Sequence, residues 1–157
     1  MSNPVHFYRK MIEKQAASLR SVKDRTGWGP SAKVKLELSL VQAFYALLKL
    51  LNEEGLPADF RHVQIPLRTY PYQSDHLQMK HWRNWRKHYR MTEAVPEMHS
   101  PEFIAHQFVY NSLFDVEQDA DKRLASVYLT SAHQKHKALY QIDVNELIEL
   151  LEESIQR

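Results

Sequence analysis

The chain has 157 residues, of which 43% are hydrophobic and 25% are charged, with a formal net charge of +2. This composition is typical of one globular domain with a buried core, and we expect a single domain over residues 1–157. The sequence has no cysteine, which excludes disulfides and thiolate metal sites and fits a cytoplasmic protein. No signal-peptide pattern is present, and Glu37, Gln42 and Lys49 interrupt the longest apolar stretch, so no membrane association is expected.

The first predicted element is a helix from about Pro4 to Asp24. Asn3 is a suitable N-cap, and proline is favoured at the first helical position. Apolar residues recur at helical spacing along this stretch, and the segment 27–30, Gly-Trp-Gly-Pro, then breaks the helix.

A second, strongly apolar helix follows and ends near Glu54, with Gly55 as its C-cap. Its start is ambiguous, because residues 33–38 alternate between polar and apolar like a strand. Either a strand precedes a shorter helix that begins at Ser39, or one long helix begins near Ser31. We favour the long helix, since residues 33 and 37 form an i,i+4 Lys–Glu pair.

Residues 55–75 contain three prolines and are predicted to form an extended connector, with a short edge strand possible around Arg61–Ile65. A third helix is expected from about His76 to Arg90. Residues 92–101, with two more prolines, are predicted to be a linker.

Ser100 is a good N-cap for a fourth helix that begins at Pro101 and ends near Phe114. Residues 115–122 are acidic and are predicted to be a solvated loop. The segments 126–130 and 137–142 are typical of two strands of a hairpin, and a last helix begins after Asp143. The expected fold class is therefore mainly α (α+β), a bundle of about five helices with a C-terminal β-hairpin.

The segment of residues 80–90, called the basic segment below, has the most distinctive composition. Five of its eleven residues are Lys or Arg, two are His, three are large aromatics and none is acidic. Cations interleaved with aromatics suit an anionic partner with flat faces, such as nucleic acid. The candidate nucleic-acid-binding residues are Lys80, Arg83, Arg86, Lys87 and Arg90.

An α-helical wheel with about 100° per residue separates the basic segment into three faces. One face is basic, one carries Trp82, Trp85 and Tyr89, and one carries His and Asn. Aromatics at this spacing are usually buried, so we expect them to pack into the core while the cations face solvent. The wheel also places Arg83 and His88 about 140° apart.

The pattern Arg83-Asn84-x-x-x-His88 resembles the RNA-cleaving motif of HEPN domains, which are small helical bundles that usually dimerise. The resemblance implies a ribonuclease that works without metal. In it, Arg83 would stabilise phosphate charge, Asn84 would orient the phosphate and His88 would act as acid or base at the ribose. These three residues are the candidate catalytic residues under this alternative.

Charge is unevenly distributed along the chain. Residues 61–90 carry seven basic and one acidic side chain, whereas residues 91–157 carry five basic and twelve acidic ones. Either the acidic part packs against the basic part and neutralises it, or a basic face stays open for a polyanion. The leading hypothesis is a nucleic-acid-binding module, and the alternatives are the ribonuclease and a protein-interaction or scaffold protein, including a homodimer.

The sequence contains nine histidines, but none lies in a His-x3-His pair that would place two ligands on one helix face. We therefore expect no metal site. With three glycines in the whole chain, a Gly-rich phosphate loop is also not expected, and no cofactor is predicted.

Overall fold

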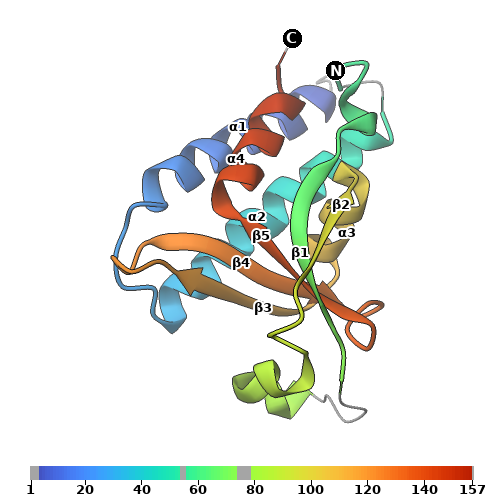
Figure 1. The fold of residues 1–157 in the computed structure, drawn as a ribbon. Coiled ribbons are helices and arrows are strands. Elements are labelled where there is room, and N and C mark those ends of the chain that lie inside the picture. Colours follow the sequence, from blue (N-terminus) through green and yellow to red (C-terminus); the bar gives the residue numbers. More distant parts are fainter. Residues whose placement is uncertain (1–3, 54–55, 74–78, 157) are drawn as a thin grey trace.

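A computed structural model describes residues 4–53, 56–73 and 79–156, and side-chain positions are not described for residues 79–83. Over these residues the chain forms four α-helices and one five-stranded antiparallel sheet (Figure 1). Two short 3₁₀ segments, η1 (Phe60–His62) and η2 (Met79–His88), lie between them.

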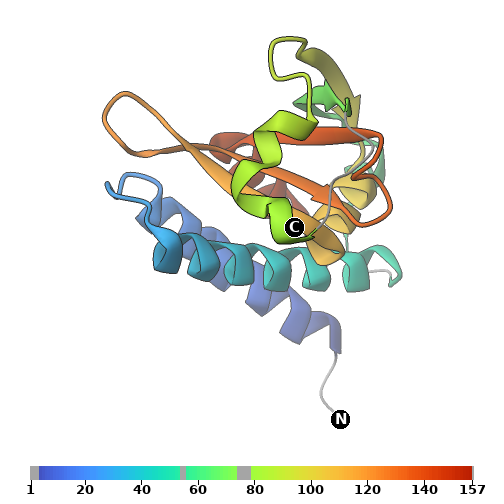
Figure 2. The ribbon, with the colours of Figure 1, turned by 90° about the horizontal axis from the view of Figure 1, so that it is seen from below.

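The two long helices, α1 (Pro4–Val22) and α2 (Pro30–Leu51), pack against each other in a layer along one side of the sheet (Figure 2). Two shorter helices, α3 (Pro101–Val109) and α4 (Val144–Ser154), complete the helical part. The Arg9 guanidinium donates a hydrogen bond to the Ile155 carbonyl at 2.5 Å, so the first turns of α1 lie beside the end of α4.

The sheet has the strand order β2-β1-β5-β4-β3. Its strands are β1 (Ile65–Pro71), β2 (Val95–His99), β3 (Asn111–Gln118), β4 (Leu124–Ser131) and β5 (Ala138–Asp143). All four pairings are antiparallel. The strand order places β2 and β3 at the two edges of the sheet.

The alternation of side chains along the strands gives the sheet two different faces. On β4, Val127 and Leu129 face the main core with all four helices, where the rings of Phe44 and Phe108 stack at 4.3 Å. Tyr128, between them, belongs to a second, smaller cluster on the opposite face. That cluster is covered by the end of η2, which lies at the end of the molecule away from α1 and α4 (Figure 1).

The predicted fold class is wrong, because the structure is an α+β fold built on a five-stranded sheet and is not a bundle of about five helices. The expected hairpin exists as β4 and β5, which pair antiparallel, but it is the centre of a larger sheet. The helical bundle implied by the HEPN resemblance is likewise not the fold of this chain.

Three strands fall where connectors or helix were expected. The expected linker contains β2, and the expected connector contains β1, which is an internal strand and not an edge strand. The fourth helix ends at Val109, and Asn111–Gln118 forms β3 in place of its last turn and the acidic loop. In contrast, α2 begins at Pro30, which confirms one long helix over residues 33–38.

Candidate nucleic-acid interface

The basic segment is not the regular α-helix that the wheel assumed. It is mostly η2, a 3₁₀ helix that is interrupted at Asn84, where φ is −116° and ψ is 29°. A 3₁₀ helix has about three residues per turn, so the angles of an α-helical wheel do not apply to it. The predicted separation of Arg83 and His88 by about 140° assumed a regular α-helix, and that assumption is wrong.

Two aromatics of the basic segment are buried, as expected. Trp85 is 5% exposed and Tyr89 is 1% exposed, and both pack in the second cluster against the sheet. The Trp85 ring lies 5.0 Å from the ring of Tyr128. Trp82 lies among the residues whose side chains are not described. Trp85 and Tyr89 therefore hold the segment on the protein and are not available for stacking on bases.

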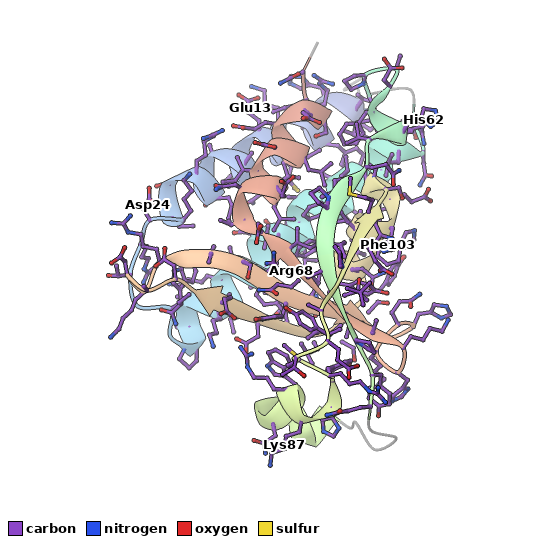
Figure 3. All side chains as sticks on the ribbon, in the orientation of Figure 1. Glu13, Asp24, His62, Arg68, Lys87 and Phe103 are labelled. Atoms are coloured by element: carbon purple, nitrogen blue, oxygen red, sulfur yellow. The ribbon has the colours of Figure 1, made fainter. Side chains whose placement is uncertain are left out.

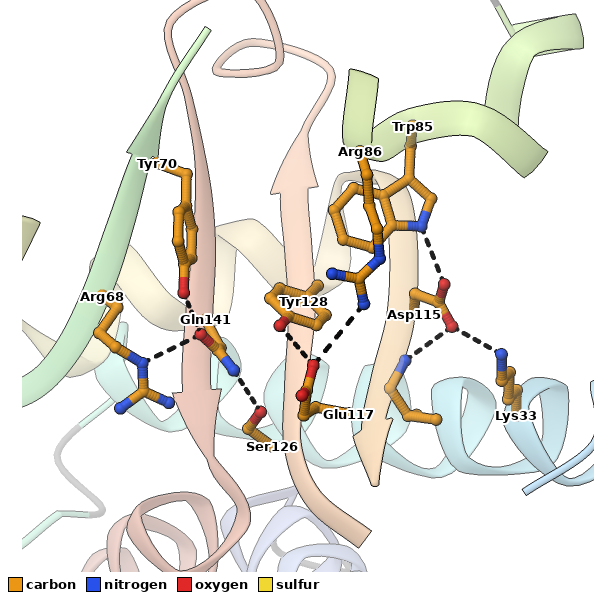
Figure 4. Close-up of polar contacts among 11 residues, drawn as sticks. Lys33, Arg68, Tyr70, Trp85, Arg86, Asp115, Glu117, Ser126, Tyr128 and Gln141 are labelled. Carbon is orange, nitrogen blue, oxygen red and sulfur yellow. Dashed lines mark hydrogen bonds and ion pairs between the residues drawn. The ribbon is translucent and has the colours of Figure 1, made fainter. Parts of the chain in front are cut away.

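Arg86 is one of the five predicted phosphate contacts, but its guanidinium is engaged within the protein. It lies over the rings of Trp85 and Tyr128, with the guanidinium carbon 4.6 Å and 5.0 Å from the two centroids. It also forms an ion pair with Glu117 on β3 at 3.6 Å (Figure 4). Glu117 in turn accepts a hydrogen bond from the Tyr128 hydroxyl. Burial, together with this bond, raises the pKa of Tyr128 to about 12.

Asp115 connects the same region to the helical layer. Its carboxylate accepts a hydrogen bond from the Trp85 indole at 2.8 Å and pairs with Lys33 of α2 at 2.8 Å (Figure 4). Burial opposes the charged form of this carboxyl, but the bonds from Lys33, Trp85 and the Val116 amide outweigh burial and lower its pKa. Asp115 therefore stays ionised, and it fixes the position of η2 over β3.

A second polar group lies on the same face of the sheet, on its central strands. Gln141 of β5 accepts hydrogen bonds from Arg68 and Tyr70 and donates one to Ser126 at 2.7 Å (Figure 4). Arg68 also pairs with Asp143 at 2.8 Å. Because these groups satisfy one another, they stabilise this face of the sheet.

The exposed cations lie beyond this network, at the end of η2. Lys87 is exposed and points away from the body of the protein (Figure 3). Arg90 is also exposed, and its partner is Glu93, at 3.4 Å with both side chains more than half exposed. Such an exposed pair contributes little energy and is readily exchanged for another anion.

The turn between β4 and β5 brings further cations to the same place. The Tyr89 hydroxyl donates to the Lys135 carbonyl at 2.7 Å, and the Tyr72 amide donates to the Lys137 carbonyl at 3.0 Å. The Tyr72 ring lies 5.2 Å from His136 and 5.6 Å from Tyr89. We call the resulting surface the basic end; it consists of Lys87, Arg90, Lys135, His136 and Lys137.

The basic end is nearly free of acidic side chains. Among the residues that the structure describes, Lys87, Lys135 and Lys137 form no ion pair, and Arg90 alone in this set has an acidic partner. The side chains of Lys80 and Arg83, predicted to contact phosphates, lie outside the described part. The structure thus retains two of the five predicted cations, Lys87 and Arg90, in an open position and adds the β4–β5 turn, which was not predicted to take part.

Two residues of the ribonuclease motif, Asn84 and His88, have described side chains. Asn84 is exposed at the interruption, His88 is partly buried, and the Arg83 side chain is not described. The His88 carbonyl accepts a hydrogen bond from the Gln73 amide at 2.9 Å. The proposed catalytic roles of these residues stay predictions.

Among the described residues, two of the acids that contact the basic segment, Asp115 and Glu117, come from β3, and Arg90 pairs with Glu93, three residues further along the chain. The acidic helix α4 instead lies on α1, where Glu152 pairs with Arg20 at 2.6 Å. Part of the basic middle of the chain is therefore neutralised by the acidic last third, through the ion pairs of Arg68 with Asp143, Arg86 with Glu117 and Arg90 with Glu93. None of these three acids lies on α4.

Within the described part of the chain, no group of three or more His, Asp or Glu side chains is arranged to hold a metal ion. No helix of that part is both long and apolar enough to cross a membrane. Comparison with protein-family models, characterised proteins and solved structures finds no match.

The sequence carried a signal for the part of the basic end that was missed. Residues 132–137, Ala-His-Gln-Lys-His-Lys, contain two lysines and two histidines and no acid. This composition resembles that of the basic segment, but only the register of β1 with β5 brings the two together.

Proposed function

We propose that the protein binds nucleic acid through the basic end. The observation that carries this proposal is the convergence of cations from two distant segments on one surface. Lys87 lies in the last turn of η2 and Arg90 follows it, whereas Lys135 to Lys137 belong to the β4–β5 turn. Tyr72 and Tyr89 join the two segments through the hydrogen bonds described above. Cations spread over a rigid surface neutralise successive phosphates, which provides affinity without reading the sequence.

Two features make this surface suitable for phosphates. Its lysines have no acidic partner within the described residues, so binding a phosphate breaks no internal ion pair. The backbone beneath them is held by hydrogen bonds and buried aromatics, so little order has to be gained on binding. The net charge of +2 is modest, and the attraction is therefore local to this end.

Charge reversal tests the proposal. Lys87→Glu combined with Lys137→Glu is expected to weaken binding of both RNA and DNA, measured by fluorescence anisotropy with labelled oligonucleotides. Lys10→Glu combined with Lys14→Glu is the matched control, because these lysines are exposed on α1 and the charge change is the same. Equal loss of affinity in the two variants, or no binding by the native protein at low salt, contradicts the proposal.

The ribonuclease alternative involves the same segment and stays a prediction. It is tested by incubating the protein with labelled RNA in the absence of metal and comparing His88→Ala. Cleavage that depends on His88 supports it, whereas intact RNA or cleavage that persists in the variant removes it.

A second candidate function, self-association, is favoured by an apolar stripe on α2. Val34, Leu38 and Tyr45 are 54%, 57% and 46% exposed, and with Val41 they follow one another at intervals of four, three and four residues. This spacing places them on one side of the helix, as in the seam of a coiled coil. We propose a second copy of the chain as the partner.

A cytoplasmic location, compatible with the absence of cysteine, is also proposed for the protein.

A further inference from the structure

A surface cavity of about 450 Å³ lies between α3 and the β4–β5 turn. Small-molecule sites are commonly about 300–1,000 Å³, so this volume can take a planar group the size of a nucleobase. Six of the residues that line it supply its aromatic and neutral polar groups: Phe103, His106, Tyr110, Ser131, His133 and Gln134.

One wall of the cavity is an exposed aromatic surface. Tyr110, the residue that ends α3, is 58% exposed. Its ring is stacked with that of His106 at a centroid distance of 5.6 Å and an interplanar angle of 19°. A ring held flat in this way can stack on any base, because every base presents a π face.

The opposite side of the cavity presents polar groups on a fixed backbone. The Gln134 amide nitrogen of the main chain donates to the Ser131 hydroxyl at 3.2 Å. The Ser131 main-chain nitrogen donates to the buried side chain of Gln107 at 3.0 Å. The Gln134 side chain and the imidazole of His133 complete this side and offer the donors and acceptors that pair with base edges.

The charge around the cavity favours a base over a phosphate. Glu102 lines the cavity and lies 3.9 Å from the His106 imidazole, so a carboxylate occupies the rim. A phosphate there would be repelled, whereas the cations of the basic end follow directly after Gln134 along the same turn. Phosphates and bases of one strand therefore have separate places side by side.

We propose that this cavity takes an unpaired base of a single-stranded nucleic acid whose phosphates lie on the basic end. The inference rests on the proposed function and makes it specific. A base that is paired inside a duplex is not available to stack on Tyr110. The protein therefore prefers single strands to duplexes of the same sequence.

The test compares three labelled probes at one salt concentration: a single strand, its duplex, and a strand of the same length with abasic sites, which keeps the phosphates and lacks the bases. The native protein is expected to bind the single strand about tenfold more tightly than the other two. Tyr110→Ala removes this preference and leaves binding of the abasic strand unchanged, whereas Tyr110→Phe keeps the preference because the ring remains. Tyr110 is more than half exposed, so these substitutions leave the core intact.

The outcomes separate the two proposals. If no probe binds, the proposed function fails together with the inference. If all three probes bind equally and Lys87→Glu with Lys137→Glu weakens all of them, the proposed function stands and the cavity is not a base site. Displacement of the strand by equimolar 5′-AMP overturns the assignment to a strand, because a free nucleotide lacks most of the phosphates that meet the basic end.

Discussion

The Trp85 indole donates a hydrogen bond of 2.8 Å to the Asp115 carboxylate, which joins the basic segment to the β3 edge of the sheet. Both residues come from parts of the chain whose local structure was predicted incorrectly. Asp115 was expected in a loop and Trp85 in an α-helix. The hydrogen bond between their side chains accounts for the position of each residue. The buried indole needs an acceptor, and the carboxylate is kept ionised by the indole and by Lys33.

Asp115 makes stability depend on pH. Because its pKa is lowered in the folded state, its stabilising contribution is complete above its ordinary pKa of about 3.9 and is lost as the pH falls through the lower, folded value. Asp115→Asn is expected to cost about 1–3 kcal/mol at neutral pH, the usual loss for a charged hydrogen-bond partner. Urea unfolding at neutral and at acidic pH checks this. The difference between the native protein and the variant narrows in acid, and a constant difference contradicts the assignment.

Arg86 is expected to affect stability more than nucleic-acid binding. Arg86→Ala removes two stacking contacts and a half-exposed ion pair, which together contribute about 1 kcal/mol. Lys87→Ala, one residue further on, has the opposite profile, since its side chain is exposed and unpaired within the described residues. Thermal unfolding and anisotropy titrations of both variants check this pair. Loss of stability in Lys87→Ala, with none in Arg86→Ala, would contradict the roles assigned to the two residues.

Ser100 is expected to stabilise α3 as its N-cap. Its hydroxyl accepts a hydrogen bond from the Phe103 amide at 3.2 Å. Ser100→Ala loses this bond and is expected to cost about 1 kcal/mol of unfolding free energy, while Ser100→Asp keeps an acceptor and retains most of it. Chemical denaturation of the two variants gives the comparison, and equal destabilisation by both substitutions argues against capping.

The stripe on α2 predicts self-association that depends on its apolar side chains. Leu38→Glu places a charge in the middle of the stripe and is expected to shift the protein from dimer to monomer in light scattering. Glu13→Lys, an exposed change on α1, serves as a control and leaves the mass unchanged. A monomeric native protein at high concentration rules out the dimer.

Local signals in the sequence located several elements well. The long helix expected from about Ser31, the Ser100 cap of α3 and the two strands of the β4–β5 hairpin are all confirmed, because each depends on neighbouring residues only. Helix caps, proline at a helix start and short alternating runs act within a few residues of one another. They therefore remain visible without knowledge of the tertiary structure.

The strands that were missed depend on partners far away in the chain. Pro66 was expected to end a short edge strand, yet β1 continues through it as an internal strand. The pairing of β1 with β5 begins only at Arg68, beyond the proline. β2 has little burial along its length and so no alternation to read. In β3, Asp115 and Glu117 gave the composition of a solvated loop, although these acids face η2 on the second side of the sheet.

The same limit applies to the candidate interface. Composition found the basic segment, and the spacing of its aromatics correctly assigned Trp85 and Tyr89 to the core. The sequence alone could not show that the Arg86 guanidinium is held by internal contacts, or that the β4–β5 turn supplies other cations. Both follow from the register of the sheet.

The most direct test of nucleic-acid binding at the basic end is its dependence on salt. Affinity for a single-stranded oligonucleotide is measured over a series of salt concentrations for three proteins. These are the native protein, Lys87→Glu with Lys137→Glu, and the control Lys10→Glu with Lys14→Glu. The account predicts a linear fall of log affinity with log salt, and a slope that is smaller by about one to two units in the first variant alone. A slope near zero in the native protein, or one that the basic-end substitutions leave unchanged, would contradict it.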